Sequence, residues 1–119
     1  GVYNAQGERS YTGSGTSLGS VMDASAANEI TQMMEGVVNN GTGYAAAIDG
    51  VQVAGKTGTA QTGQFTPEGT ERCNLWFAGF WPAEKPRYTI VVLQDGAVHT
   101  AYSGATIFAQ VCNALEAAG

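Results

Sequence analysis

Four consecutive residues near the middle of the chain combine a positive charge, two hydroxyls and a position without a side chain: Lys56, Thr57, Gly58 and Thr59. If this stretch is extended, successive side chains alternate between two faces, so Thr57 and Thr59 point the same way. Gly58 between them removes the Cβ that would block a substrate lying against the backbone. Such a strand can meet a substrate carboxylate with two hydroxyls and one ammonium group. The Thr59 amide can donate to a carbonyl oxygen that becomes negative during a reaction.

The same lysine also fits a phosphate-binding pattern. Residues 50 to 57 read G-x-x-x-x-G-K-T, and a later apolar stretch ends at Asp95, where such a site would place an acid that holds magnesium. A phosphate-binding loop, however, needs a helix that begins at its lysine, because the free amides of that helix cradle the phosphates. Residues 51 to 54 alternate as a strand does, and the residues after Lys56 begin no helix. The sequence favours the extended interpretation, with a solvent-facing strand end of purely structural meaning as the alternative.

Length and composition describe one ordinary domain. Of the 119 residues, 44% are hydrophobic and 13% are charged, which argues against disorder. The apolar runs are far shorter than the roughly 20 residues that a membrane helix needs. Five Lys and Arg against ten Asp and Glu leave a net charge of -5, the wrong sign for a protein that contacts a phosphate backbone. We therefore expect no nucleic-acid partner.

The cysteines and the histidine indicate no metal site. Cys73 and Cys112 lie far apart in the sequence, and with the single histidine, His99, they cannot supply the usual four ligands of zinc. Two free, partly buried thiols and a disulfide are both compatible with this spacing. His99 lies in the connection before the last expected helix, where we expect a loop residue rather than a general base. We expect no cofactor.

Two helices are expected, one before and one after the centre of the chain. The first spans residues 24 to 40, where Asp23 or Ser25 can cap its start and Gly41 can end it. The second spans residues 103 to 117. Apolar residues at helical spacing give each helix one apolar face. They are Ile30, Met33, Met34, Val37 and Val38 in the first helix, and Ile107, Phe108, Val111, Cys112 and Leu115 in the second.

Three strands are expected within residues 51 to 95, where β-branched and aromatic residues concentrate. Their predicted ranges are 51 to 61, 75 to 81 and 88 to 94. The connection PAEKPR makes the last two an antiparallel hairpin, whereas the longer TGQFTPEGTERC is expected to be a loop. Residues 1 to 20 form a loop-rich lead-in of Gly, Ser and Thr. The predicted fold class is α+β, an antiparallel sheet with both helices able to cover one sheet face.

From about Val21 to Leu115 the chain resembles the C-terminal part of the transpeptidase domain of class B penicillin-binding proteins. These are the monofunctional D,D-transpeptidases of bacterial cell-wall synthesis. K-T-G alone is a weak signal, because class A β-lactamases share it. The resemblance is specific because it combines VAGKTGTAQ, the preceding helix that ends in GVVNNGTG, and WFAGFWP.

The resemblance implies that residues 1 to 119 are the C-terminal portion of such a domain, with three strands of a five-stranded sheet. It implies that Lys56 assists electrostatically, and that Thr57 and Thr59, on either side of Gly58, bind the carboxylate of a peptidoglycan stem peptide or of a β-lactam antibiotic. The Thr59 amide would form half of an oxyanion hole. The parent protein would act at the extracytoplasmic face of the bacterial membrane, anchored by an N-terminal helix.

The chain departs from the family pattern in one respect. The nucleophile motif S-x-x-K and the second motif S-x-N, which precede K-T-G in the family, do not occur in it. We expect the acylated serine in an upstream segment and expect this chain alone to be inactive. The inner edge of the last strand would be paired by that segment, a dimer or swapped partner, or the residues before Gly19. A non-catalytic penicillin-binding or sensor module is the alternative, and a nucleotide-binding protein a distant one.

Overall fold

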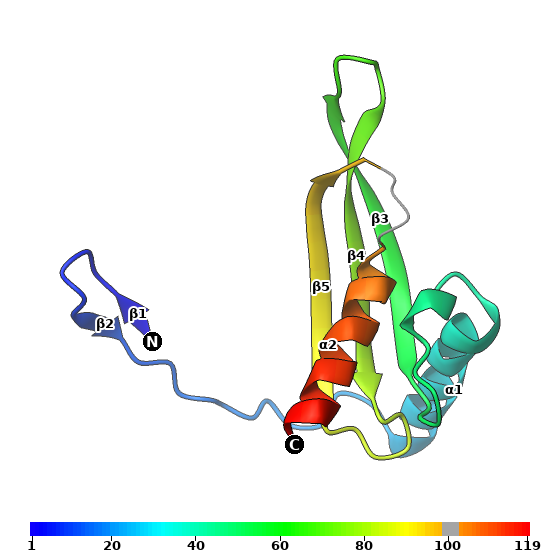
Figure 1. Cartoon of the computed structure of the whole chain (residues 1–119). Coiled ribbons are helices and arrows are strands. Elements are labelled where there is room, and N and C mark those ends of the chain that lie inside the picture. The colour runs from blue at the N-terminus through cyan, green and yellow to red at the C-terminus, as the bar shows by residue number, and fades with distance from the viewer. Residues whose placement is uncertain (99–102) are drawn as a thin grey trace.

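The fold is α+β, as predicted, and is built around a three-stranded antiparallel sheet (Figure 1). The computed structural model describes residues 1 to 98 and 103 to 119, so the expectation for His99 lies outside the described residues. The sheet has the strand order β3-β4-β5. In chain order the elements are β1 (Val2–Tyr3), β2 (Arg9–Tyr11), α1 (Ala24–Asn40), the short 3-10 helix η1 (Tyr44–Ala46), β3 (Ala54–Phe65), β4 (Glu71–Trp81), β5 (Tyr88–Ala97) and α2 (Gly104–Ala118).

β3 and β4 extend into the connection that we expected to be a loop, and that expectation is wrong. β3 begins at Ala54 and ends at Phe65, and β4 begins at Glu71, so only a short turn separates them. The Thr66 amide donates to the Thr70 carbonyl oxygen at 2.9 Å across this turn. Figure 1 shows the resulting arm standing clear of the rest of the sheet. An arm that buries neither face needs no alternation of apolar residues, so its sequence lacks the usual strand pattern.

The core lies between β4 and α2. Along β4, Leu75, Phe77 and Trp81 are buried, whereas Trp76 on the other face is 41% exposed. The ring of Phe77 meets that of Phe108 in α2 edge to face, with 4.9 Å between the ring centroids. This alternation follows from the two-residue period of a strand and identifies the face that α2 covers.

Glycines surround the Phe77 ring. A Cβ on Gly55 would lie 2.3 Å from Phe77 Cζ, and one on Gly79 would lie 3.1 Å from Phe77 Cε1. A Cβ on Gly104, the first residue of α2, would lie 3.1 Å from Phe77 Cβ, and one on Gly43 would lie 3.3 Å from Cε2. Real Cβ atoms essentially never approach within 3.0 Å, so Gly55 is required if the ring is to keep its place. β3, β4, the start of α2 and the loop after α1 therefore all approach the side chain of Phe77 closely.

α1 begins and ends where the sequence predicts, but its apolar face is partly misassigned. The Asp23 carboxylate accepts from the Ala26 amide at 2.8 Å, and this hydrogen bond lowers the pKa of Asp23. Val38 is buried, whereas Ile30 is 40% and Met33 is 65% exposed. Helical spacing identifies an apolar stripe wider than the surface that β3 covers. Ile30 and Met33 lie at the border of this stripe and stay exposed to solvent.

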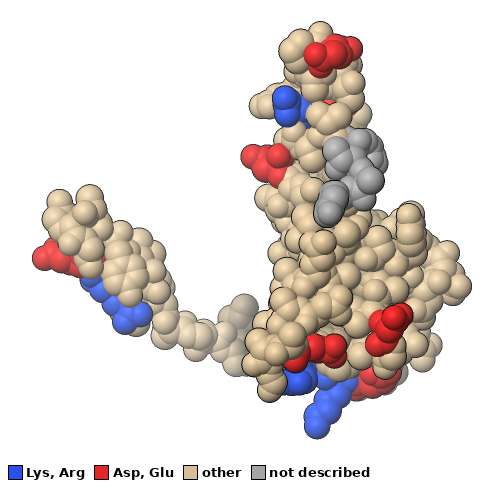
Figure 2. Space-filling view, viewed as in Figure 1, with Lys and Arg blue, Asp and Glu red and all other residues tan. Residues whose placement is uncertain are grey.

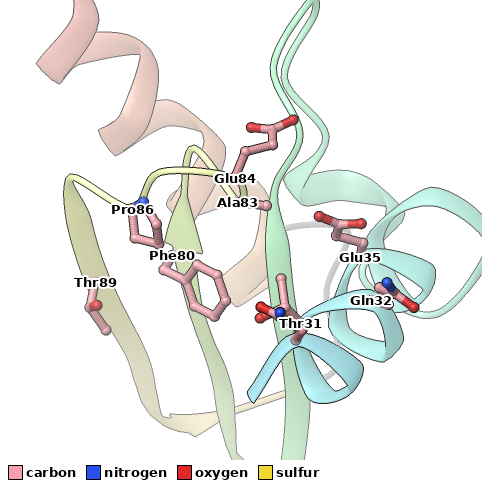
Figure 3. A pocket seen from close by; sticks show the side chains of 9 residues that line it. Thr31, Gln32, Glu35, Phe80, Ala83, Glu84, Pro86 and Thr89 are labelled. Atoms are coloured by element: carbon pink, nitrogen blue, oxygen red, sulfur yellow. The ribbon is translucent and has the colours of Figure 1, made fainter. Parts of the chain in front are cut away.

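The two helices approach the sheet differently, although Val38 near the end of α1 belongs to the same buried cluster as Phe77 and Phe108. α2 covers the Phe77 face, because Phe77 and Phe108 are in contact. On the other face, Thr31 and Glu35 of α1 lie across a hollow from Phe80, as Figure 3 shows. Side chains along a strand alternate between its two faces. Phe77 and Phe80 are three residues apart, so they lie on opposite faces of β4.

The residues before Gly19 do not extend the sheet. β1 and β2 pair with each other in a separate two-stranded sheet, connected to α1 by an extended segment (Figure 1). Within the part of the chain that the structure describes, β5 therefore has a strand neighbour on one side only. Val91 and Leu93 of β5 are 60% and 46% exposed. Pairing of this edge by another segment or chain stays a prediction.

In the part of the chain that the structure describes, neither helix is long and apolar enough to span a bilayer.

Substitutions at two glycines should have opposite effects on stability. Gly55→Ala places a methyl group inside the Phe77 ring and should lower the free energy of unfolding by about 1 to 3 kcal/mol. Gly36 lies within α1 with nothing described within 4 Å of its added Cβ, so Gly36→Ala should raise stability by roughly 0.5 to 1 kcal/mol. Urea unfolding of both variants checks this. Equal effects of the two substitutions would contradict the packing described for Phe77.

The Cys112 thiol should be nearly unreactive in the folded protein. Both cysteines are free thiols, and burial raises the pKa of Cys112 to about 11, with a smaller contribution from Glu116. At pH 8 roughly one Cys112 thiol in a thousand is then ionised, and only the thiolate is nucleophilic. In a Cys73→Ser variant, Ellman's reagent should react at least about a hundredfold more slowly under native conditions than in concentrated urea. Equal rates in the two conditions would show that Cys112 is accessible.

Candidate functional site

The four residues singled out by the sequence lie on β3, at the edge of the sheet. β3 pairs with β4 on one side only, with Thr57 opposite Phe77 and Thr59 opposite Leu75. This register puts both threonines on the sheet face that α2 covers. On an edge strand, every second backbone amide points outward and has no partner within the sheet. β3 therefore offers hydroxyls on one face and unpaired backbone groups along its edge.

A hollow of about 260 Å³ opens beside these residues. Thr57, Gly58 and Thr59 line one side of it, and Ser103 and Gly104 at the start of α2 line another. Two further segments complete the wall: Thr42 from the loop after α1 and Trp76 from β4 also line it. The threonines that the sequence predicts to act together are thus brought together.

Hydrogen bonds fix the polar groups of this hollow. The Lys56 ammonium group donates to the Thr57 carbonyl oxygen at 2.8 Å and lies 3.4 Å from Thr57 Oγ1. Thr57 Oγ1 also lies 2.9 Å from Thr42 Oγ1. Although Lys56 alternates away from Thr57 along the strand, its long side chain brings the charge back to the edge. The ammonium charge of Lys56 and the hydroxyl of Thr57 therefore lie next to each other.

Gly58 has a different geometric role from the one we expected. A Cβ on Gly58 would lie 3.4 Å from Trp76 Cβ, an ordinary contact distance. Because Trp76 pairs with Gly58, this Cβ would point to the sheet face opposite Thr57 and Thr59. A Cβ at Gly58 would therefore make an ordinary contact with Trp76 and would not stand between the two hydroxyls.

The electrostatics of the hollow favour an anion. Its lining residues include no Asp or Glu, and Lys56 reaches its edge. The N-terminus of α2, capped by Ser103 Oγ, which accepts from the Thr106 amide at 3.3 Å, adds the positive end of a helix dipole. Figure 2 shows charged side chains near the tip of the arm, at the opposite end of the body and on the separate β1–β2 hairpin.

A larger hollow, of about 550 Å³, lies elsewhere and contains none of the predicted residues. Figure 3 shows Thr31, Gln32 and Glu35 of α1 on one side of it and Phe80 and Glu84 on the other. Two carboxylates in its wall would repel a carboxylate ligand rather than bind it. Size alone does not identify the site, and the smaller hollow beside β3 has the matching chemistry.

A phosphate-binding loop does not fit the observed geometry. Gly55, Lys56 and Thr57 lie within one continuous strand, and no helix begins at the lysine. The pattern G-x-x-x-x-G-K-T therefore lacks the free helix amides that a phosphate needs. Within the described ranges, no three His, Cys, Asp or Glu side chains come together in a way that could hold a metal ion.

Sequence reasoning missed the contribution of Thr42 and Ser103. Thr42 lies 15 residues before Thr57 and meets it only because the chain turns back through η1 to start β3. From the sequence, Ser103 was expected only to begin the second helix, of which it is the N-cap. The only local signal for Thr42 was the tripeptide GTG at residues 41 to 43. From the sequence it was interpreted as the end of the first helix.

Comparisons with known proteins agree on one family. The family model of the penicillin-binding protein transpeptidase domain matches residues 5–115. Penicillin-binding protein PbpB of Mycolicibacterium smegmatis is 44% identical over 66 residues, which are 49% of this chain and 9% of that protein. The crystal structure of the D,D-transpeptidase domain of a peptidoglycan glycosyltransferase from Eggerthella lenta is 39% identical with a TM-score of 0.68. The alignment covers 98% of this chain and 26% of that one.

A further solved structure contains a ligand. Penicillin-binding protein 3 of Mycobacterium tuberculosis, crystallised in complex with ampicillin, is 30% identical with a TM-score of 0.69. The alignment covers 98% of this chain and 28% of that one. The chain thus spans about a tenth of the length of the relative from M. smegmatis and about a quarter of each solved structure.

Proposed function

Because the chain belongs to the family of penicillin-binding protein transpeptidase domains, as a class B member, we propose that it forms one wall of a peptidoglycan D,D-transpeptidase active site. The observation that carries this proposal is the hollow beside β3, where two hydroxyls and one ammonium group converge at an unpaired strand edge. That combination suits a substrate with a terminal carboxylate. Acyl transfer at a peptide bond needs such a grip next to the reacting carbonyl.

Each residue has a defined part in the proposal. Thr57 and Thr59 donate to the carboxylate of the stem peptide, and Lys56 compensates its charge. The Thr59 amide, on the edge strand, donates to the oxygen that becomes negative as the carbonyl is attacked. Gly58, between these two threonines, leaves the backbone free for close approach of the substrate. The same grip would hold the carboxylate of a β-lactam, and the related ampicillin complex supports that assignment.

The nucleophile is assigned to a segment outside this chain. None of the six serines is followed by lysine at the third position, and Ser103 Oγ is engaged as a helix cap. A serine that attacks a carbonyl needs an adjacent base to accept its proton. We place that serine and its base in an upstream segment that closes the hollow from the open side. The parent protein would act at the extracytoplasmic face of the bacterial cell membrane.

A non-catalytic penicillin-binding or sensor module is the second candidate. The observation that favours it is that this chain carries the carboxylate grip without any nucleophile motif. The two candidates differ in the motifs that their genes should encode upstream of this chain. The region that encodes residues upstream of Gly1 contains S-x-x-K and S-x-N in a transpeptidase and lacks at least one of them in a sensor.

Replacing Lys56 should impair acylation of the parent protein by penicillin. Lys56→Ala removes a charged partner of the carboxylate and should lower the second-order acylation rate by about ten- to a hundredfold, from roughly 1.5 to 3 kcal/mol of lost interaction. Thr59→Ala keeps the backbone amide and loses only a hydroxyl, so its effect should be smaller. Fluorescent penicillin labelling followed over time measures both. Lys85→Ala, which removes the other lysine of these 119 residues, is the matched control and should leave the rate unchanged. Equal rates for Lys56→Ala and Lys85→Ala would refute the proposed grip.

The 119-residue chain alone should not retain penicillin covalently. Without an activated nucleophile the site can bind a small acid only reversibly. Fluorescent penicillin should leave no labelled band for this chain after denaturing electrophoresis, whereas the parent protein should give one. A labelled band for the isolated chain would place a nucleophile inside it and overturn the proposed division of the site.

A further inference from the structure

We infer that Thr42 is a positioning residue, which directs the hydroxyl proton of Thr57 toward the bound carboxylate. The inference rests on the proposed function, because it concerns the same carboxylate grip. Its starting point is the distance of 2.9 Å between Thr42 Oγ1 and Thr57 Oγ1, across a gap of 15 residues in the sequence. Thr42 also lines the hollow beside Thr57.

The backbone holds Thr42 in place from both sides. The Gly41 amide donates to the Val37 carbonyl oxygen at 3.1 Å, and the Gly43 amide donates to the same oxygen at 3.0 Å. Gly43 is buried, and a Cβ there would lie 3.1 Å from Val37 Cγ1 and 3.3 Å from Phe77 Cε2. Thr42 is exposed and stands between these two anchored residues, with its hydroxyl directed to that of Thr57. This fixed position is what orientation of a second hydroxyl requires.

The donors and acceptors around Thr57 Oγ1 determine which way its proton points. The Lys56 ammonium group, 3.4 Å away, can only donate. A carboxylate can only accept, so a bound carboxylate requires the single Thr57 proton. The contact between the two hydroxyls then has one possible direction, with Thr42 donating to Thr57. Thr42, Thr57 and the carboxylate form a chain of hydrogen bonds, in which each bond strengthens the next.

Loss of the Thr42 hydroxyl should weaken acylation without removing the grip. In the full-length parent protein, Thr42→Val keeps the shape of the side chain and removes the donor. Acylation by fluorescent penicillin should fall about three- to tenfold, the range expected for one neutral hydrogen bond. Thr42→Ser restores a hydroxyl at the same position and should return the rate to within about twofold of the original. Equal rates for the original protein and Thr42→Val would overturn the inference.

A double-mutant cycle separates positioning from a general structural role. In a Thr57→Val background there is no proton to direct, so Thr42→Val should cause no further loss of acylation. A structural role of Thr42 would lower the rate by the same factor in both backgrounds, and that result would overturn the inference. Thermal unfolding of each variant shows whether the fold is kept. If Thr42→Val does not fold, Thr42→Ala in both backgrounds provides the same cycle.

The two proposals fail in different ways. If Thr57→Val leaves acylation unchanged, the hollow beside β3 is not the carboxylate grip, and the proposed function and the role of Thr42 fall together. If Thr57→Val lowers acylation and Thr42→Val does not, the grip stands and only the role of Thr42 is wrong.

Discussion

The packing of one aromatic ring among glycines is the constraint on which the rest of the structure depends. Phe77 is buried, and Gly43, Gly55, Gly79 and Gly104 approach it so closely that a side chain at any of them would meet the ring or the atoms beside it. These glycines belong to four different segments. The ring therefore fixes the positions of β3, β4, the start of α2 and the loop after α1 relative to one another.

The candidate site lies directly above this packing. Thr57 pairs with Phe77 across the sheet, so the hydroxyl that we assign to carboxylate binding follows the backbone that the ring holds. Thr42 precedes Gly43, and Ser103 precedes Gly104. Both of these lining residues of the hollow are therefore bonded to glycines that pack against Phe77. The apolar packing around Phe77 thereby positions the polar groups that line the hollow, as a preorganised site requires.

The sequence predicts those parts of the fold that have a local signal. Asp23 caps α1 as predicted, and K-T-G lies on an edge strand, because a cap and a glycine between threonines are recognisable within a few residues. Met33 was assigned to the core and is exposed, since helical spacing does not say how much of an apolar stripe a neighbour covers. The contact of Thr42 with Thr57 depends on the path of the chain through η1, which no local pattern encodes.

The two outer edges of the sheet differ in their tendency to aggregate. β3 presents glycines, threonines and Lys56 at its edge, a composition that discourages pairing with unrelated chains while leaving room for one extended ligand. β5 presents Val91 and Leu93, which are apolar, strand-forming and exposed. An edge of that kind invites further strands. The solubility of any preparation of this chain should therefore be governed by β5, on the far side of the sheet from the residues that carry the chemistry.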